Sequence, residues 1–305
     1  MTAQAPIEAT VDRSTGIGGT DVSAILGLNP WRSPVDVWLE KTGRGEPTPD
    51  NEAMYWGRVL EDTVASEYAR RTGRRVRRVN RTLRHRESPL LMAHIDRKVE
   101  SEPAVLECKT AGERAADRWG PAGTDEVPEY YLLQVLHYLE VTGYKWAAVA
   151  VLIGGRDYRT YEVPGDRELQ RRAVDECLQW WARHVDQDVP PEPRDPAEAA
   201  KLWPRHRPEA AVTADDEVQA AVAELHQLHG SRKEVEQRER QLKARIQAAM
   251  GDAERLVGQD GRTLATWKAS RPTQSVDVKA LQAAEPEVAE RYTIERPGSR
   301  RFVLK

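Results

Sequence analysis

Residues 92–110 read MAHIDRKVESEPAVLECKT and contain two short runs in which apolar and polar residues alternate. This alternation is typical of β-strands, and the polar break at residues 100–103 predicts two adjacent antiparallel strands. In the second run Glu107 and Lys109 share one face, because side chains point alternately to opposite sides of a strand. In the first run Met92, His94 and Asp96 share one face in the same way. Asp96 can therefore approach Glu107 if the strands pair with that face inward. The pattern therefore predicts two carboxylates and one ammonium group in one place.

Two carboxylates held together repel each other, and a divalent cation is one of the usual ways to relieve that repulsion. Magnesium is the expected ion, with manganese as a possible substitute, because it prefers oxygen ligands and keeps several waters. Asp96, Glu107 and the backbone carbonyl of Cys108 are the predicted ligands. Lys109 would orient or deprotonate an attacking water, or stabilise charge on a phosphate. Taken alone, the triplet is also compatible with an exposed strand face and a turn acid.

The residues around this triplet favour a buried strand and a catalytic role. Val105 and Leu106 make a poor surface strand. Glu61 lies at the margin of the apolar stripe of a preceding helix, so a third acid faces inward. Gln134 and Tyr138 are four residues apart on a following helix and hence share a face, where they suit positioning of a lysine, a water or a phosphate. A helix boundary and a packed aromatic explain that last pair equally.

The order of helix, strands, helix and strand predicts an α/β fold with a mixed central sheet flanked by helices. We expect this core over residues 1–188, followed by a proline-rich linker at 189–210 that blocks regular structure. Residues 211–305 are expected to form a coiled-coil-like long helix or helical hairpin around Gly230, followed by a small β appendage that contains a β-hairpin. That helical region carries approximate heptad spacing at Val218, Val222, Leu225, Val235, Leu242, Ile246 and Ala249.

Composition narrows the classes of protein that are possible. The chain has 305 residues, a net charge of -3 and only two cysteines, which argues against a disulfide framework and against a zinc or iron–sulfur site. Any surface for nucleic acid must be local, since the whole chain is not basic. The sequence has neither a signal-peptide pattern nor a run of about 20 apolar residues, so we expect a cytoplasmic protein without a membrane segment.

Together these motifs resemble the YqaJ-like viral recombinase family, which includes relatives of the phage lambda exonuclease in the PD-(D/E)xK superfamily. The resemblance covers roughly residues 13–163 and implies a PD-(D/E)xK core. It also implies an exonuclease that digests one strand of linear duplex DNA from the 5′ end, working with a single-strand annealing protein and plausibly as a ring-shaped homotrimer. The motifs that carry the resemblance are RSTGIGGTD at 13–21, GRVLE ending at Glu61, MAHIDRKV with Asp96, LECKT with Glu107 and Lys109, and QVLHY with Gln134 and Tyr138.

By the same resemblance, Arg13 and Thr20 match the positions that hold the 5′-terminal phosphate in relatives. An arginine fork and glycine-rich backbone suit an anion, although an ordinary glycine turn with a surface arginine gives the same sequence. This chain departs from the family at one position, because Asp96 is followed by Arg97 instead of glycine. That difference leaves the predicted ligand intact but changes the expected local turn.

Nine arginines lie between positions 70 and 86, with no acid among them. A solvated basic face is one explanation. Contact with DNA phosphates explains this density of arginines better in a chain of negative net charge. It also predicts DNA binding that weakens strongly as the salt concentration rises. The predicted DNA contacts in this run are Arg74, Arg75, Arg77 and Arg78.

Two other functions remain open at this point. One is an endonuclease on the same core, which would cut a covalently closed circle that an exonuclease leaves intact. The other is a non-catalytic DNA-binding scaffold for recombination. The complete set of acids and lysine argues against the scaffold.

Overall fold

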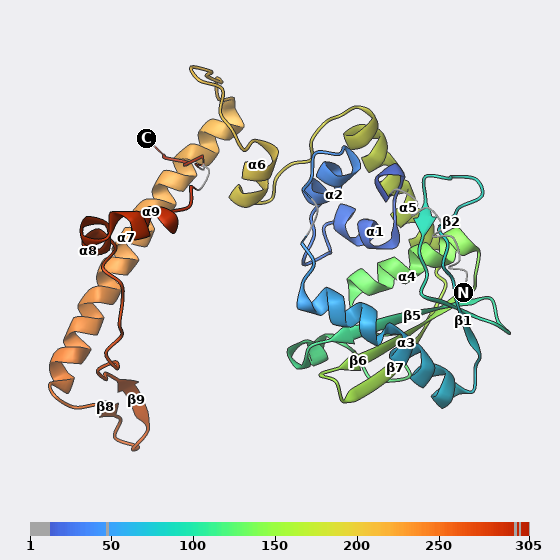
Figure 1. Cartoon of the computed structure of the whole chain (residues 1–305), viewed down its shortest axis with the longest axis horizontal. Helices are drawn as coiled ribbons and strands as arrows, with labels where there is room; N and C mark the ends of the chain where they lie inside the picture. Colours follow the sequence, from blue (N-terminus) through green and yellow to red (C-terminus); the bar gives the residue numbers. More distant parts are fainter. Residues whose placement is uncertain (1–12, 47–48, 296–297, 299, 305) are drawn as a thin grey trace. The chain divides into compact units, whose positions relative to one another are not determined.

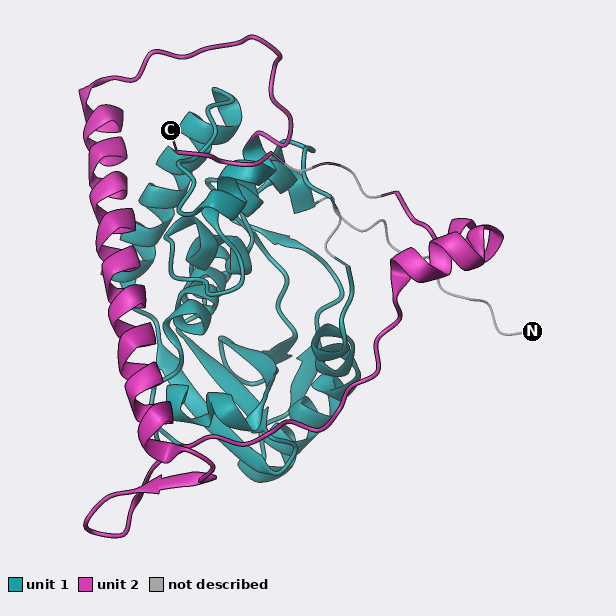
Figure 2. Ribbon diagram, turned by 90° about the vertical axis from the view of Figure 1, so that its left-hand side faces the viewer, with its two compact units in different colours: residues 1–202 teal, residues 203–305 magenta. Residues whose placement is uncertain are grey.

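The computed structural model describes residues 13–46, 49–295, 298 and 300–304. The chain divides into two compact units, residues 1–202 and 203–305, which Figure 2 colours teal and magenta. The division falls within the segment expected as a linker at 189–210. The first twelve residues of the expected core lie outside the described residues. Each unit is considered by itself below.

A five-stranded mixed sheet forms the centre of the first unit, in the order β1-β4-β5-β6-β7. Strands β5 and β6 are parallel, and the other pairs are antiparallel. A parallel pair needs a crossover connection, which the helix α4 provides between β5 and β6. The strands are β1 (Val76–Arg78), β4 (Arg97–Val99), β5 (Ala104–Ala111), β6 (Trp146–Ile153) and β7 (Asp157–Pro164).

Helices cover both faces of this sheet, which confirms the expected α/β class. The helix α3 (Glu52–Thr72) packs on one face and α4 (Glu129–Thr142) on the other (Figure 1). The alternation of strand residues decides the two layers: Leu106 lies in the cluster with α3, and Val105 lies in the cluster with α4. The ends of α4 match the sequence signals, because the helix starts after Pro128 and stops at Gly143, whose φ is 70°.

The first predicted strand is interrupted. Met92–Ala93 forms β3, which pairs with β2 (Leu83–Arg84) in a separate small sheet, and β4 begins only at Arg97. The backbone of Met92 is bound by the segment around Ile17, because the Met92 N–H donates to the Ile17 carbonyl at 2.8 Å. The expectation that Met92, His94 and Asp96 share one face of a single strand is therefore wrong, although Asp96 still reaches β5.

The other elements of the first unit surround this core. The predicted linker is not devoid of regular structure, since it contains α6, whose Lys201 forms an ion pair with Asp36 of α2 at 2.5 Å. The elements are η1 (Arg13–Thr15), α1 (Gly19–Ile25), α2 (Pro34–Lys41), η2 (Glu113–Arg118), α5 (Arg167–Trp181), η3 (Ala182–Asp186) and α6 (Pro196–Leu202).

Of the two arrangements expected for the second unit, the structure shows the long helix and not the helical hairpin. Helix α7 (Asp216–Met250) runs through Gly230 without a turn, and the Asp215 side chain caps it by accepting from the Val218 N–H. An interior glycine costs only about 1 kcal/mol, too little to break a helix of good formers. The expected β-hairpin does form, from β8 (Arg255–Val257) and β9 (Thr263–Thr266). The helices α8 (Val278–Ala284) and α9 (Pro286–Arg291) follow it.

In the part of the chain that the structure describes, none of the helices combines the length and the apolar character that a membrane span requires.

Candidate active site

Asp96 and Glu107 meet at the point where β4 and β5 stop pairing. The last β4–β5 pair joins Arg97 to Leu106, so Asp96 lies just beyond it, beside the next residues of β5. Its Oδ2 accepts from the Cys108 N–H at 2.8 Å. The backbone of β5 therefore holds the first carboxylate against the strand that carries the second one.

Glu107 lies at the centre of a network of side chains that faces α4. It is only 3% exposed, and its Oε1 accepts from the Lys109 Nζ at 2.6 Å and from the Gln134 Nε2 at 2.7 Å. The Gln134 Oε1 in turn accepts from Lys109 at 3.2 Å, and its Nε2 also donates to the Tyr138 hydroxyl at 2.9 Å. Of the predicted α4 pair, Gln134 thus contacts both Glu107 and Lys109, and Tyr138 contacts Gln134.

The electrostatics of the site follow from burial and from the closeness of like charges. Burial, reinforced by the Glu107 charge, raises the pKa of Asp96 to about 8. Burial works against the charge of Lys109, but Glu107 outweighs it and raises the pKa of the ammonium group. The Lys109 Nζ also lies 4.6 Å from the centre of the Tyr131 ring, which adds a cation–π contact. Lys109 is therefore charged near neutral pH, while Asp96, whose pKa is about 8, mostly keeps its proton there in the absence of metal.

This donor set fits a hard divalent cation. The second carboxylate oxygen of Glu107, Oε2, is buried and has no hydrogen-bond partner among the described residues. The Cys108 N–H points toward Asp96, and in a strand the carbonyl of the same residue points to the same side. Two carboxylates and one carbonyl oxygen thus border one space. No cluster of three or more His, Cys, Asp and Glu side chains suited to a metal occurs among residues 13–46 and 49–295.

Glu61, the predicted third acid, contacts an arginine instead of the other acids. Its Oε1 accepts from the Arg97 guanidinium at 2.6 Å, and Arg97 also binds Asp62 and, at 2.7 Å, the carbonyl of Asp96. Arg97 is 4% exposed and lies on the α3 side of the sheet, opposite Leu106. The residue that replaces the family's glycine therefore holds Glu61 beside the site without joining it to Glu107.

The predicted glycine motif packs directly against the face of α4 that carries Gln134 and Tyr138. A Cβ atom on Gly19 would lie 2.6 Å from the Tyr138 ring and 3.0 Å from the Gln134 Cγ, so only glycine fits there. Arg13 and Thr20, which flank this contact, are both exposed. The structure thus brings the predicted phosphate residues next to the predicted catalytic residues, a closeness that the sequence could not give.

The predicted DNA-contacting arginines divide into two kinds. Arg74 contacts Glu102 at 3.0 Å and Glu162, and its guanidinium lies over the Trp146 ring at 4.7 Å. These contacts tie Arg74 to the sheet, and their charges offset its own. The others lie at the surface, where Arg75 is 3.4 Å from Glu100, Arg78 is 3.6 Å from Glu61, and Arg77 is exposed on β1.

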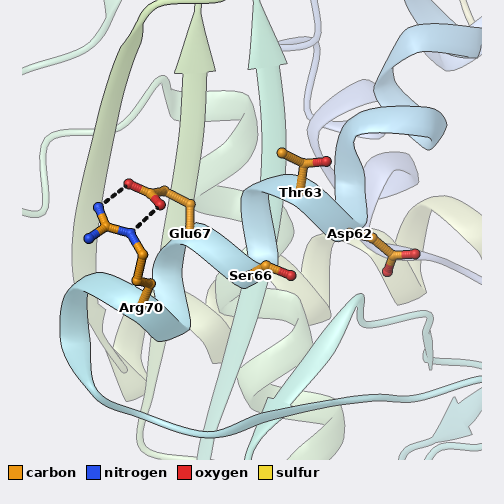
Figure 3. Close-up of a pocket in the computed structure, with 5 residues that line it drawn as sticks. All are labelled: Asp62, Thr63, Ser66, Glu67 and Arg70. Atoms are coloured by element: carbon orange, nitrogen blue, oxygen red, sulfur yellow. Dashed lines mark hydrogen bonds and ion pairs between the residues drawn. The ribbon is translucent and has the colours of Figure 1, made fainter.

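A surface hollow lies along α3 but outside this site. Figure 3 shows its lining side chains on one helix, with Glu67 joined to Arg70 by an ion pair of 2.7 Å. Asp62 connects the hollow to the site, because it contacts Arg97, whose guanidinium donates to the carbonyl of Asp96. The hollow contains no member of the Asp96, Glu107 and Lys109 set, so it is not where we locate the chemistry.

Sequence reasoning did not identify Tyr131 or the role of Arg97. Tyr131 is next to a run of apolar helix residues and gives no signal by itself. Arg97 was noticed as a departure from the family, but its contacts with α3 depend on a pairing over 36 residues of sequence.

The fold and the site define a class: an α/β core of the PD-(D/E)xK type. Comparison with known proteins identifies the family within that class. The model of the YqaJ-like viral recombinase domain matches residues 10–145. The protein named YqaJ of Bacillus subtilis (strain 168) is 35% identical over 307 residues, which cover 98% of this chain and 93% of that protein. The chain belongs to the YqaJ-like viral recombinase family, which confirms the resemblance seen in its motifs.

Solved structures resemble the chain in part. An alkaline exonuclease from Laribacter hongkongensis has a TM-score of 0.47 and 16% identity, covering 57% of this chain and 90% of that one. A phage-related exonuclease from Haemophilus somnus 129PT has a TM-score of 0.45 and 11% identity, covering 57% of this chain and 96% of that one.

Proposed function

We propose that this protein is a metal-dependent deoxyribonuclease that digests one strand of linear duplex DNA from the 5′ end. The observation that carries the proposal is the pair formed by the part-buried Asp96 and the buried Glu107, with Lys109 bonded to Glu107 and one Glu107 oxygen left without a partner. Membership of a viral recombinase family supports DNA as the substrate.

Magnesium is the proposed cofactor, with manganese as a substitute. Asp96, Glu107 and the carbonyl of Cys108 would hold it, because their oxygen atoms border one space and the two carboxylates repel in its absence. The bound ion supplies Lewis-acid activation of water and of the scissile phosphate. Glu61 would assist from the edge of the site, within the limits set by its bond to Arg97.

The remaining groups act on the water and on the phosphate. Lys109 carries its charge near the reacting centre, where it orients the attacking water and stabilises negative charge on the phosphate as the P–O bond breaks. Gln134 fixes the side chains of Glu107 and Lys109 through three hydrogen bonds to them and to Tyr138. Because these side chains are held in place before the reaction begins, Lys109 can raise the rate of cleavage.

An exonuclease must recognise a DNA end, and the glycine motif is the proposed place for it. Arg13 and Thr20 would hold the 5′-terminal phosphate beside Tyr138, against which Gly19 packs. The exposed arginines Arg75, Arg77 and Arg78 would follow the duplex backbone. Arg74 contributes less to DNA binding in this proposal, because Glu102 and Glu162 offset its charge.

The family also supports two proposed partners. A single-strand annealing protein would receive the 3′ overhang that 5′ digestion leaves. Further copies of this chain would form a ring around the duplex, as a trimer, and so favour processive digestion. Neither partner is needed for the chemistry at Asp96 and Glu107.

A digestion assay tests the proposal. Linear duplex DNA with 5′-phosphate or 5′-hydroxyl ends is incubated with magnesium or with EDTA, beside a covalently closed circle. We expect magnesium-dependent loss of the linear DNA alone, faster with the phosphate. Cutting of the circle would make the protein an endonuclease on the same core, and absence of cutting in every condition would favour a DNA-binding scaffold.

A further inference from the structure

Lys41, the last residue of α2, is a buried lysine that joins two parts of the glycine motif. Its side chain is 1% exposed. Its Nζ donates to the backbone carbonyl of Arg13 at 2.7 Å and forms an ion pair with the Asp21 Oδ2, also at 2.7 Å. A lysine that far from water is uncommon unless its charge is paired.

Asp21 completes the connection from the other end of the motif. The same Oδ2 accepts from the Gly18 N–H at 2.8 Å, and the Oδ1 contacts Arg32 at 2.5 Å. Burial opposes the charge of Asp21, but Lys41 and Arg32 outweigh it and hold the pKa of the carboxyl below its usual range. Lys41 and Asp21 therefore form a charged, buried clamp across residues 13–21.

Net stability does not explain such a clamp well. The cost of removing two charges from water roughly cancels their attraction, so a buried ion pair contributes little to stability. What the clamp does fix is the backbone on both sides of Gly16. On one side is the carbonyl of Arg13, and on the other is the turn that lays Gly19 on Tyr138 and Gln134.

The Arg13 guanidinium is close enough to the site to act on it. Burial lowers the pKa of His94, and the positive charge of Arg13 lowers it further. Burial raises the pKa of the Tyr138 hydroxyl, and the positive charge of Arg13 acts in the opposite direction. The side chain of Arg13 is exposed. The bond from Lys41 to its backbone carbonyl fixes the position from which that side chain extends.

We propose that Lys41 is a positioning residue for recognition of the 5′-terminal phosphate: with Asp21 it fixes the Arg13 backbone so that the guanidinium faces the DNA end beside the active site. This inference rests on the proposed function and assigns Lys41 no contact with DNA. Its consequence is a loss of phosphate preference without a loss of general DNA affinity.

The test measures binding of a 3′-labelled duplex with a 5′-phosphate or a 5′-hydroxyl, by fluorescence anisotropy with calcium in place of magnesium. We expect the wild-type protein to prefer the phosphate by about tenfold, the value of one charge-assisted contact. Lys41→Met should reduce that preference to about twofold or less, as Arg13→Ala does, with the affinity for the hydroxyl duplex unchanged. Lys201→Met is the matched control, because Lys201 also pairs with an acid of this region but lies at the surface.

Two further variants separate positioning from general damage. Asp21→Asn keeps an acceptor for Gly18 but removes the charge beside Lys41, so it should also weaken the preference. Each single variant leaves the other residue a second partner, since Arg32 contacts Asp21 and Glu40 lies 3.5 Å from Lys41. In the double variant Arg13→Ala with Lys41→Met, the preference should be no lower than in Arg13→Ala alone.

The outcomes are distinguishable. A folded Lys41→Met protein that keeps the wild-type preference overturns the proposal. If Lys41→Met does not fold, Asp21→Asn carries the test by the same criterion. A wild-type protein without phosphate preference would also overturn it, while magnesium-dependent digestion of linear DNA in the separate assay would leave the nuclease function standing.

Discussion

The acids on the two sides of β5 have different surroundings: Glu107 belongs to the strand itself, whereas Glu61 and Asp62 belong to the helix α3, which packs on its other face. On the face toward α4, Glu107 binds Lys109 and Gln134 and keeps one oxygen without a partner. On the face toward α3, Arg97 occupies both Glu61 and Asp62. The α4 face has carboxylate capacity left for a ligand, and the α3 face is neutralised internally. The difference indicates that chemistry belongs to the first face and support to the second.

Removing Lys109 should have the largest effect, because it would remove the only cation of the ExK motif. We expect Lys109→Ala to lower the rate of cleavage about a thousandfold while DNA binding changes little. Lys98→Ala is the matched control, since the Lys98 Nζ also lies over an aromatic ring, that of Tyr144 at 5.7 Å, but forms no ion pair with Asp96 or Glu107. Single-turnover cleavage and anisotropy measure the two quantities. Unchanged cleavage by Lys109→Ala would remove the α4 face from the mechanism.

Metal binding should depend on pH because of Asp96, whose pKa is about 8 without metal. Below that pH a cation must displace a proton from the carboxyl, and above it the carboxylate is already ionised. The dissociation constant for magnesium should therefore fall about tenfold for each pH unit up to about pH 8 and then level off. Isothermal titration calorimetry in buffers of different ionisation enthalpy also counts the proton released. A constant affinity from pH 6 to pH 8 would contradict the repulsion between Asp96 and Glu107.

The same carboxyl should make the metal-free protein less stable at high pH. A raised pKa means that the folded state holds the proton more tightly than the unfolded chain, whose carboxyl titrates near 3.8. That stability is complete below 3.8 and is lost as the pH rises through about 8. In EDTA at pH 8, Asp96→Asn should therefore raise the free energy of unfolding by about 3 kcal/mol, and by much less at pH 5.

Urea denaturation at the two pH values measures this difference. Asp157→Asn, which changes a half-exposed acid on β7, is expected to alter stability little at either pH. An Asp96→Asn protein that is less stable than wild type at pH 8 would mean that the carboxylate is well accommodated without metal. The α4 face would then lack the unrelieved charge that distinguishes it from the α3 face.

The sequence predicted those parts of the molecule that depend on local pattern. The alternation in AVLECKT correctly identified β5, and the spacing of Gln134 and Tyr138 correctly put them on one face of α4. Distant contacts could not be read in this way. The position of the Glu61 side chain depends on Arg97, and the break before β4 depends on the backbone bonds of Ile17, which accepts from the Met92 N–H and donates to the Leu90 carbonyl.

Heptad spacing around Gly230 is compatible with both a long helix and a helical hairpin, so the sequence could not decide between them. The structure shows one helix, because α7 continues through this glycine. A glycine permits a turn, but without flanking residues that pack the two arms together a continuous helix keeps more backbone hydrogen bonds.

Glu61→Gln should have the smallest effect and is the sharpest test of the difference between the two faces. Because Arg97 keeps its contacts with Asp62 and with the carbonyl of Asp96, the site should survive, and cleavage should fall about tenfold or less. Magnesium affinity should stay near the wild-type value, whereas Glu107→Gln should weaken it severely. Glu67→Gln is the matched control, since Glu67 lies on the same helix and also pairs with arginines, Arg70 and Arg71.

The opposite result would be equally informative about the α3 face. If Glu61→Gln weakened magnesium binding as much as Glu107→Gln, Glu61 would have to leave Arg97 when the ion binds. Arg97→Met should then strengthen magnesium binding in a background that retains Glu61, because the competing cation is gone. If instead Arg97→Met leaves the magnesium affinity unchanged, Glu61 does not exchange Arg97 for the ion. The α4 face would then bind the ion without help from the α3 face.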